Sequence, residues 1–350
     1  MAARVLVVGA GPVGAIIAAL LARRGSGCAV RLWDKARGPG GRMSTSRSPN
    51  NESCSADLGA QYISATPAYW LEHEKFYEEL LDRGILYPLQ SQVDGMKEYE
   101  ENIRHFIVPE GTSSLVKYYL QESGAEVLYN HHVQRVHLGD GVVTVENRDG
   151  SSACVDTLIL TMPIPQILQL QGNLQAMLNA DQRRALEMAT YSSRFALGLF
   201  YNSDADFEFP WTAKYVSDNS VIRYIAVNKK KRSQECGSVG PSLVVHTNVA
   251  FGQKYVDEDV NVVQPFILAE LNRLLPGLPQ HAYGKCHKWR YSQVTRPVGG
   301  SAGHMVLSAE PLILCAGDGF THSNFDGCVK SALSAVEAFK SIFLDGKSGH

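Results

Sequence analysis

Four residues near the start of the chain have the types and spacing of a dinucleotide-binding site. The glycines of Gly9-Ala10-Gly11-Pro12-Val13-Gly14 fit the pattern G-x-G-x-x-G, and Asp34 follows Gly14 by 20 residues. Gly9 permits a tight turn, Gly11 lets the backbone approach a diphosphate, and Gly14 allows a helix to pack closely on a strand. The diphosphate then meets free N–H groups at the helix N-terminus, and the acid accepts hydrogen bonds from a ribose.

Three further stretches indicate a flavin rather than a nicotinamide cofactor. Asp34-Lys35 leads to Gly40-Gly41-Arg42, where paired glycines and a bidentate donor suit a second loop over the same diphosphate. Residues 56–62 read as a short strand and turn that ends at Gln61 and Tyr62. The apolar strand 311–316 ends at Gly317-Asp318, where an acid can bind a ribityl hydroxyl.

The elements that must position these residues can be read from the same segment. Residues 5–8 form a β-branched, apolar run typical of a buried parallel strand, and residues 15–21 are good helix formers. A second strand follows at 29–33. The alternative, a secretory leader or a membrane anchor, requires an uninterrupted apolar core, and three glycines and a proline divide this one. We therefore expect a strand, turn, helix and strand.

Composition restricts the classes of partner. The 350 residues carry a formal net charge of −2, so we expect the protein to bind neither nucleic acid nor membrane. We also expect it to be a monomer. The basic run 228–232 is interpreted as a solvated turn, with an anionic phosphate ligand as the alternative. Seven scattered cysteines, Cys236 among them, indicate reduced thiols and a cytoplasmic protein. No metal is expected, because the adjacent His131 and His132 would point to opposite faces of a strand.

These motifs together resemble the flavin amine oxidase superfamily. Three other stretches, residues 192–200, 288–295 and 317–328, make the resemblance closer to its renalase family. The resemblance implies an α/β chain: a Rossmann-like FAD-binding domain with an inserted mixed α+β substrate domain. The FAD-binding domain would comprise residues 1–85, 109–165 and 299–342, and the substrate domain residues 86–108 and 166–298. FAD would bind non-covalently, with the backbone around Val133 against the adenine.

The resemblance also implies a reaction. A small-molecule substrate, a 2- or 6-dihydro isomer of NAD(P), would pass hydride to flavin N5, giving NAD(P)+ and, with O2, hydrogen peroxide. No residue is required as acid or base, because the substrate ring becomes aromatic as it loses hydride. The site must instead hold two flat rings at near-attack distance. The candidate substrate-pocket residues are Tyr62, Tyr215, Arg223, His246, Trp289 and Phe325.

Alternatives remain open at this point. His246 and Trp289 could be core residues, and Arg223 could pair with an acid. A flavin amine oxidase acting on catecholamines would use the same scaffold. A secreted signalling protein with a vestigial flavin is a further alternative, because the family has been described as secreted.

Overall fold

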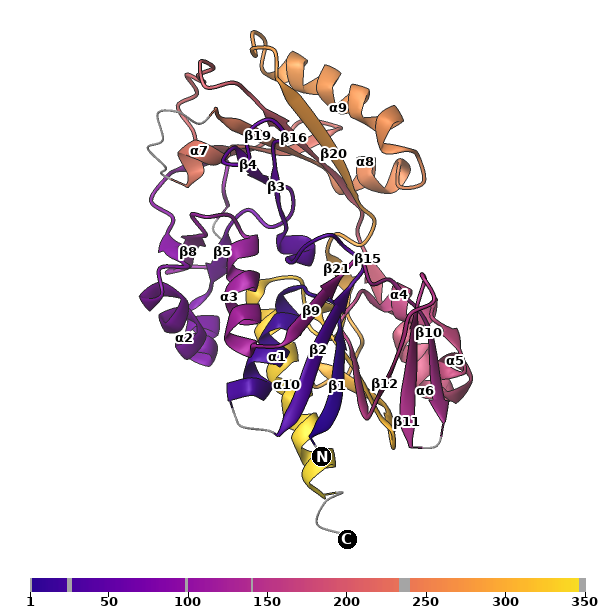
Figure 1. Ribbon diagram of the computed structural model, residues 1–350. Helices are drawn as coiled ribbons and strands as arrows, with labels where there is room; N and C mark the ends of the chain where they lie inside the picture. The colour runs from indigo at the N-terminus through magenta and orange to yellow at the C-terminus, as the bar shows by residue number, and fades with distance from the viewer. Residues whose placement is uncertain (1, 24–26, 98–99, 140, 233–239, 346–350) are drawn as a thin grey trace. The chain divides into compact units, whose positions relative to one another are not determined.

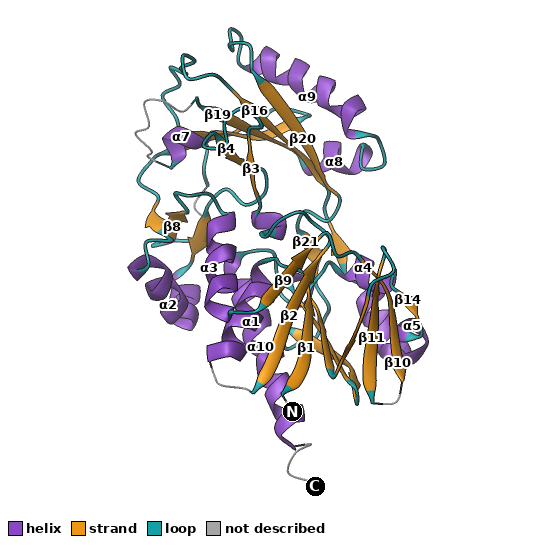
Figure 2. Cartoon of the chain, viewed as in Figure 1, coloured by secondary structure: helices purple, strands orange, loops and turns teal. Residues whose placement is uncertain are grey.

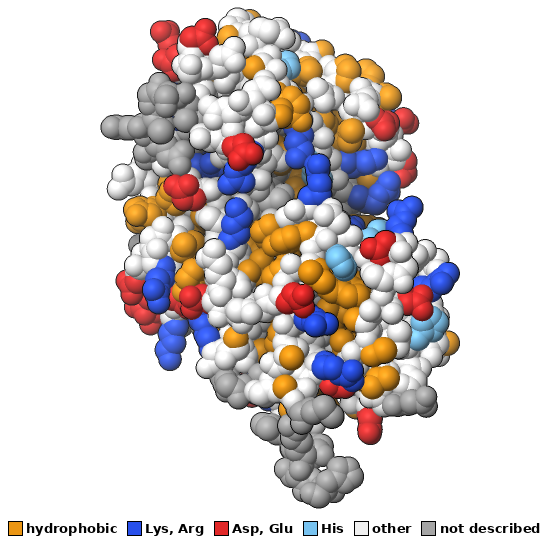
Figure 3. Space-filling model, viewed as in Figure 1, with side chains coloured by type: hydrophobic (Ala, Val, Ile, Leu, Met, Phe, Trp, Pro, Cys, Tyr) orange, Lys and Arg blue, Asp and Glu red, His pale blue; other side chains and the backbone are white. Residues whose placement is uncertain are grey.

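The chain forms two compact units in a computed structural model that describes residues 2–23, 27–97, 100–139, 141–232 and 240–345. The first unit comprises Met1–Gly41, Val116–Thr190 and Val294–His350, and the second comprises Arg42–Leu115 and Tyr191–Gln293. Both signs of charge occur on the visible face of each unit (Figure 3). None of the helices in the described ranges is both long and apolar enough to cross a membrane.

A mostly parallel sheet forms the centre of the first unit (Figure 1, Figure 2). Its order is β22 (His304–Ala309), β23 (Leu312–Ala316), β13 (Thr157–Leu160), β1 (Ala3–Val8), β2 (Cys28–Asp34) and β9 (Glu126–Tyr129), with β22 antiparallel to β23. Every residue of β13 and β23 is buried, as parallel strands between covering layers must be. Because the strands are parallel, β1, β2, β13 and β23 end at one edge of the sheet.

Helices and a second sheet complete the first unit. Helices α1 (Pro12–Arg23) and α10 (Phe325–Asp345) pack against each other beside the parallel sheet. The second sheet contains an antiparallel meander, with Gly150 at a positive φ in one of its turns. The order of the second sheet is β12 (Ser152–Val155), β11 (Val142–Asn147), β10 (Val133–Gly139) and β14 (Gln171–Gly172). The short helices are α4 (Ile164–Leu168), α5 (Leu174–Met177) and α6 (Ala180–Glu187).

The second unit is organised around a sheet with two different faces. Its order is β20 (Tyr283–Trp289), β16 (Arg194–Phe200), β19 (Ser242–Thr247), β18 (Ile222–Val227), β17 (Ala213–Tyr215) and β7 (Val93–Asp94). Phe195, Leu197 and Val245 point to one face, where they pack with residues of α8 (Val249–Lys254) and α9 (Val260–Leu274). Ala196 and Val244 point to the other face, where they pack with residues of β4 (Ser55–Asp57).

The remaining elements are two longer helices, α2 and α3, and several short strands and turns of helix. Around the second unit lie η1 (Gly41–Met43), β3 (Thr45–Arg47), β5 (Ile63–Ala65), α2 (Pro67–Asp82), β6 (Tyr87–Pro88), β8 (Arg104–Ile107) and α7 (Asn228–Lys231). The others are α3 (Ser113–Ser123), β15 (Thr190–Tyr191), β21 (Val294–Arg296) and η2 (Asp318–Phe320).

The expected fold class is confirmed: one unit contains a mostly parallel α/β sheet, and the other is a mixed unit of sheet and helices. Helix α9 begins at Val260, because the Asp259 side chain accepts a hydrogen bond from Asn261 N and caps the helix. Residues 42–85 pack within the second unit, whereas the expected domains assigned them to the FAD-binding part. Those domain bounds stay a prediction, because ligand contact rather than packing defines a cofactor-binding domain.

Gly14→Ala is expected to destabilise the cofactor-free protein by about 1–3 kcal/mol, the usual cost of overpacking. An added Cβ at Gly14 would lie 2.0 Å from the Gly9 carbonyl oxygen, so backbone atoms must move. Gly11→Ala is the matched control, because a Cβ there meets no atom within 4 Å. Urea unfolding of both variants without cofactor measures the difference. Equal loss of stability would contradict the close-packing role of Gly14.

Candidate functional site

Of the three glycines in the first turn, only Gly11 has open space around the position that a Cβ would occupy. Gly9 N donates to Trp33 O at 2.8 Å, and an added Cβ at Gly9 would lie 2.4 Å from Thr161 Oγ1. Gly14 is equally crowded, as described above. At Gly11 nothing lies within 4 Å of the Cβ position, and the helix α1 begins at the next residue, Pro12, followed by the buried Val13. The turn is thus a cradle at a helix N-terminus that fits a diphosphate.

The expected second loop does fold against this turn. Gly40 N donates to Ala10 O at 2.9 Å, and an added Cβ at Gly41 would lie 3.4 Å from Gly11 Cα. The Asp34 carboxylate accepts hydrogen bonds from Ala10 N and Ala36 N, both at 2.7 Å. These two backbone donors fix the carboxylate at the carboxyl end of β2, where a ribose would need it.

Two other predicted cofactor residues of the first unit are buried at element ends. Val133 begins β10 and is 5% exposed. Lys35, which follows Asp34 and was also predicted to bind the cofactor, is exposed. Asp318 follows β23 and is 3% exposed, and Ser323 Oγ donates to its carboxylate. Gly317 adopts a φ of +132° and donates from its N–H to Ser331 Oγ at 2.7 Å.

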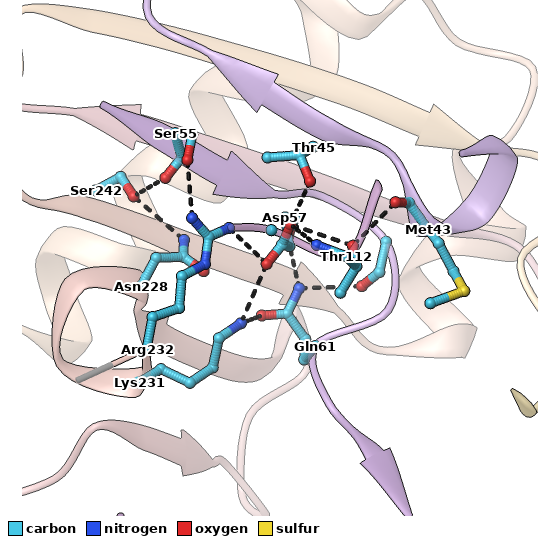
Figure 4. A network of polar contacts seen from close by, with 12 residues as sticks. Met43, Thr45, Ser55, Asp57, Gln61, Thr112, Asn228, Lys231, Arg232 and Ser242 are labelled. Atoms are coloured by element: carbon cyan, nitrogen blue, oxygen red, sulfur yellow. Dashed lines mark hydrogen bonds and ion pairs between the residues drawn. The ribbon is translucent and has the colours of Figure 1, made fainter. Parts of the chain in front are cut away.

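A buried cluster of charges dominates the second unit (Figure 4). The Asp57 carboxylate, at the end of β4, accepts from Arg232 Nη2 at 2.6 Å and lies 3.8 Å from Lys231 Nζ. Thr45 Oγ1 at 2.7 Å and Thr112 N at 3.0 Å also donate to it. Burial opposes ionisation of Asp57, but the two cations outweigh burial, and the pKa of its carboxyl lies below its ordinary value.

The interpretation of residues 228–232 as a solvated turn is wrong. Lys231 is 2% exposed and Arg232 is 5% exposed, because the short helix α7 turns both side chains inward to Asp57. Lys230 Nζ donates to the carbonyl of Phe209 at 3.0 Å. A charge run carries no sign of a buried partner, and Asp57 lies 175 residues away from Arg232 in sequence.

Gln61 connects the charge cluster to His246, one of the predicted pocket residues. Lys231 Nζ donates to Gln61 Oε1 at 3.0 Å, and Gln61 Nε2 donates to the carbonyls of Asp57 and Gly59. The same amide nitrogen lies 3.4 Å from His246 Nε2. Burial lowers the pKa of His246 to about 3, and the charges of Arg194 and Lys231 act in the same direction. His246 is therefore neutral at physiological pH.

His246 belongs to a row of rings that crosses the sheet. Tyr215 pairs with Tyr224, Tyr224 with His246, His246 with Ala196, and Ala196 with His287, each on the neighbouring strand. Ring centroids are 5.0 Å apart for the two tyrosines and 5.8 Å for Tyr224 and His246. Paired residues share a face, so this aromatic row lies on the face opposite α8 and α9. Burial lowers the pKa of His287 to about 4, so it too is neutral.

Other predicted pocket residues adjoin this aromatic row. Tyr62 Oη lies 2.5 Å from Tyr215 Oη, and Trp289 Nε1 donates to the Leu58 carbonyl at 2.7 Å. The structure thus brings Tyr62, Tyr215, Arg223, His246 and Trp289 into the second unit. Phe325 belongs to the first unit, where it is buried at the start of α10. Arg42, which was expected to bind a diphosphate, contacts the Ser292 carbonyl at 3.4 Å.

Two arginines flank the aromatic row. Arg223 Cζ lies 5.3 Å from the Tyr215 ring centroid, and Arg223 Nη1 donates to Val216 O at 3.1 Å. Arg194 Nη1 donates to Thr247 O at 3.2 Å. Of the ion pairs formed within the described ranges, none involves either arginine. The alternative that Arg223 pairs with an acid therefore finds no support in the described structure.

Sequence reasoning missed several of these residues. Tyr224, His287 and the cation pair Lys231–Arg232 carry no motif, and the pairing of Tyr224 with Tyr215 depends on the register between two strands. Tyr224 Oη is buried and has no hydrogen-bond partner among the described residues, which is uncommon for a buried hydroxyl.

The fold and the glycine cradle define a dinucleotide-binding flavoprotein of the oxidoreductase class. The family model "NAD(P)-binding Rossmann-like domain" matches residues 7–80, and "Flavin containing amine oxidoreductase" matches residues 82–339. The chain is 47% identical to renalase of Mus musculus over 338 residues, which is 96% of this chain and 98% of that protein. It therefore belongs to the renalase branch of the flavin-containing amine oxidoreductase family, and it is a flavin-dependent oxidoreductase.

A solved structure supports the fold at much greater sequence distance. A putative protoporphyrinogen oxidase from Exiguobacterium sp. 255-15 has a TM-score of 0.71 with this chain at 14% identity. The match covers 97% of this chain and 99% of the other. At that identity the likeness shows the fold alone.

Asp57→Asn is expected to cost about 3–5 kcal/mol of folding stability, because it leaves buried cations without their counter-charge. Asp156→Asn is the matched control. The Arg4–Asp156 pair has the same 2.6 Å separation as the Arg232–Asp57 pair, but its side chains are 50% and 38% exposed instead of 3% and 2%. Exposed pairs contribute about 0–1 kcal/mol. Denaturant unfolding of both variants tests this, and similar losses would contradict the role of burial.

Lys231→Met is expected to change how stability depends on pH. Burial lowers the pKa of Lys231 from 10.5 to about 8, although the charge of Asp57 opposes this. Between these values the unfolded chain binds more protons than the folded one, so this group makes stability rise with pH. The total rise is about 3 kcal/mol.

The measured quantity is the difference in unfolding free energy between wild type and Lys231→Met from pH 7 to 10.5. Buried thiols and phenols such as Cys286 and Tyr201 have raised pKa values and act in the opposite direction in both proteins. Their contribution cancels in the difference between the unfolding free energies of wild type and Lys231→Met. A difference that stays constant over this range would show that the Lys231 ammonium is not destabilised by burial.

Proposed function

We propose that this chain is an FAD-dependent oxidase of the 2- and 6-dihydro isomers of NAD(P), acting as a monomer on a small-molecule substrate and O2. The observation that carries the proposal is the uncharged aromatic row of the second unit, beside two arginines that form no ion pair with any described acidic residue. Such a surface suits a flat, neutral ring attached to an anionic tail. Reduced nicotinamide dinucleotides have both parts.

The residues of each unit fit FAD, bound non-covalently. In the first unit, Gly11 offers an open cradle for the diphosphate, Asp34 is held for a ribose, and Asp318 suits a ribityl hydroxyl. The sequence predicts Arg42, Gln61 and Tyr62 as further cofactor contacts. When bound, the flavin accepts a hydride at N5 and returns the electrons to O2 as hydrogen peroxide.

The protein groups of the row position the ring instead of exchanging protons with it. His246 is neutral, with its Nε2 facing the Gln61 amide, so it can hold a carboxamide or ring edge by hydrogen bonding. Tyr62 and Tyr215 hold each other through their hydroxyls. A dihydronicotinamide becomes aromatic as hydride leaves, so orientation and water exclusion are the main requirements.

Oxidation of a catecholamine is disfavoured by the same charges. An amine substrate is an ammonium ion at neutral pH, and Arg194 and Arg223 would repel it across a partly desolvated surface.

The compartment that we propose is the cytoplasm. No disulfide joins the six described cysteines, which supports this proposal; Cys236 lies outside the described residues.

The proposal is tested by anaerobic stopped-flow mixing of the FAD-loaded protein with borohydride-reduced NAD, which contains the 2- and 6-dihydro isomers. We expect the flavin absorbance to bleach within seconds, whereas a catecholamine leaves it unchanged. His246→Ala should slow bleaching about 10- to 100-fold, since small misplacements of a reacting ring cost rates of this order.

The control for His246→Ala is His137→Ala, an exposed histidine on β10 of the first unit, which should leave the rate unchanged. FAD content is measured in all three proteins before mixing. Bleaching by the catecholamine and not by the reduced isomers would replace the proposal with amine oxidation.

A further inference from the structure

Arg194 and Arg223 are half-buried cations, and among the described residues no carboxylate forms an ion pair with either of them. Two other arginines of the second unit do have such a partner: Arg232 binds Asp57 at 2.6 Å, and Arg290 binds Asp257 at 2.8 Å. The neighbours of Arg194 are the Thr247 carbonyl and, at 3.4 Å, the Gln293 side chain. Carbonyl and amide oxygens orient a guanidinium but do not neutralise it.

The two charges are close enough to act on each other and on the aromatic row. Burial lowers the pKa of Arg194, and the charge of Arg223 lowers it further. The charge of Arg194 also lowers the pKa of His246. Two cations held together at a partly desolvated surface are unfavourable unless an anion joins them. The arrangement is therefore that of an anion site.

Backbone geometry explains why both side chains reach the same place. Arg194 precedes Ala196 by two residues on β16, so strand alternation puts Arg194 on the face of the aromatic row. The pairing of β18 with β19 shifts register between Ile222 and Tyr224, and Arg223 lies at this irregularity. A bulge re-aims a side chain, and here the Arg223 guanidinium lies over the Tyr215 ring.

We propose that Arg194 and Arg223 form the subsite for the phosphate groups of the substrate, next to the aromatic row that holds its ring. The inference rests on the proposed function and adds the residues that select a phosphorylated nucleotide. Paired guanidinium groups suit this task, because each presents several fixed N–H donors to phosphate oxygens. The phosphate that they bind is either the diphosphate bridge or the 2′-phosphate of NADP.

The test uses the FAD-loaded enzyme and three reduced substrates: nicotinamide riboside, nicotinamide mononucleotide and NAD, which carry no, one and two phosphates. In wild type we expect KM to fall as phosphates are added. In Arg194→Gln and in Arg223→Gln, the ratio of the riboside KM to the NAD KM should fall about 10-fold or more towards one. Arg290→Gln, which removes an exposed arginine of the same unit, should keep the wild-type ratio.

A second readout does not depend on turnover. Inorganic pyrophosphate should raise the melting temperature of the FAD-loaded wild type and of Arg290→Gln, but not of Arg194→Gln or Arg223→Gln. In the loaded protein the cofactor's own diphosphate occupies the glycine cradle, so this probe reports the second subsite.

The KM measurements also separate the two phosphates. A larger fall in the KM ratio for reduced NADP than for reduced NAD would assign the subsite to the 2′-phosphate.

Either arginine variant retaining both the wild-type KM ratio and the pyrophosphate effect would overturn the subsite. Failure of the proposed function looks different: no reduced nicotinamide would bleach the wild-type flavin, while the pyrophosphate measurement would still report whether the arginines bind an anion.

Discussion

The ion pair between Asp57 and Arg232 is the interaction on which the second unit's site depends. The Asp57 carboxylate lies where β4 ends, and it gathers donors from β3, from Thr112 before α3, and from α7. The turn that follows carries Leu58, whose carbonyl anchors Trp289, and Gln61, whose amide faces His246. One desolvated charge pair thereby fixes the backbone from which the pocket side chains are held. Because the pair is buried, removal of either partner would leave an uncompensated charge in the interior.

Charge and ring recognition are separated on the sheet. The histidines of the aromatic row, His246 and His287, are kept neutral by burial, and nearby cations reinforce this. Positive charge is concentrated in Arg194 and Arg223 at the border of the row. Under the proposed function, the neutral row would accept a flat ring that brings no counter-ion, and the arginines would attract an anionic tail. The same separation would work against small cations, which the arginines would repel.

Sequence reasoning succeeded where the chemistry is local. The glycine turn, Asp34 and the Gly40–Gly41 loop lie within 34 residues, and each glycine's task follows from its spacing, so the dinucleotide fold could be predicted. It failed for the run 228–232, because hydrophilic residues read as exposed until a distant counter-charge is known. The pairing of Tyr215, Tyr224 and His246 depends on strand register across separate segments, and one sequence does not specify register.

The two faces of the second unit's sheet differ in how closely their side chains are packed. The face that packs on α8 and α9 is filled by Phe195, Leu197 and Val245, and its shape is fixed by close packing. The opposite face also has buried residues, such as Ala196 and Val244, but the rings of Tyr215, His246 and His287 on it are only partly buried. Those rings can change without breaking the core that packs on α8 and α9. A structure with 14% identity can therefore keep the architecture at a TM-score of 0.71. Under the proposed function, substrate choice would depend on the side chains of the second face, which in this chain are neutral rings bordered by Arg194 and Arg223.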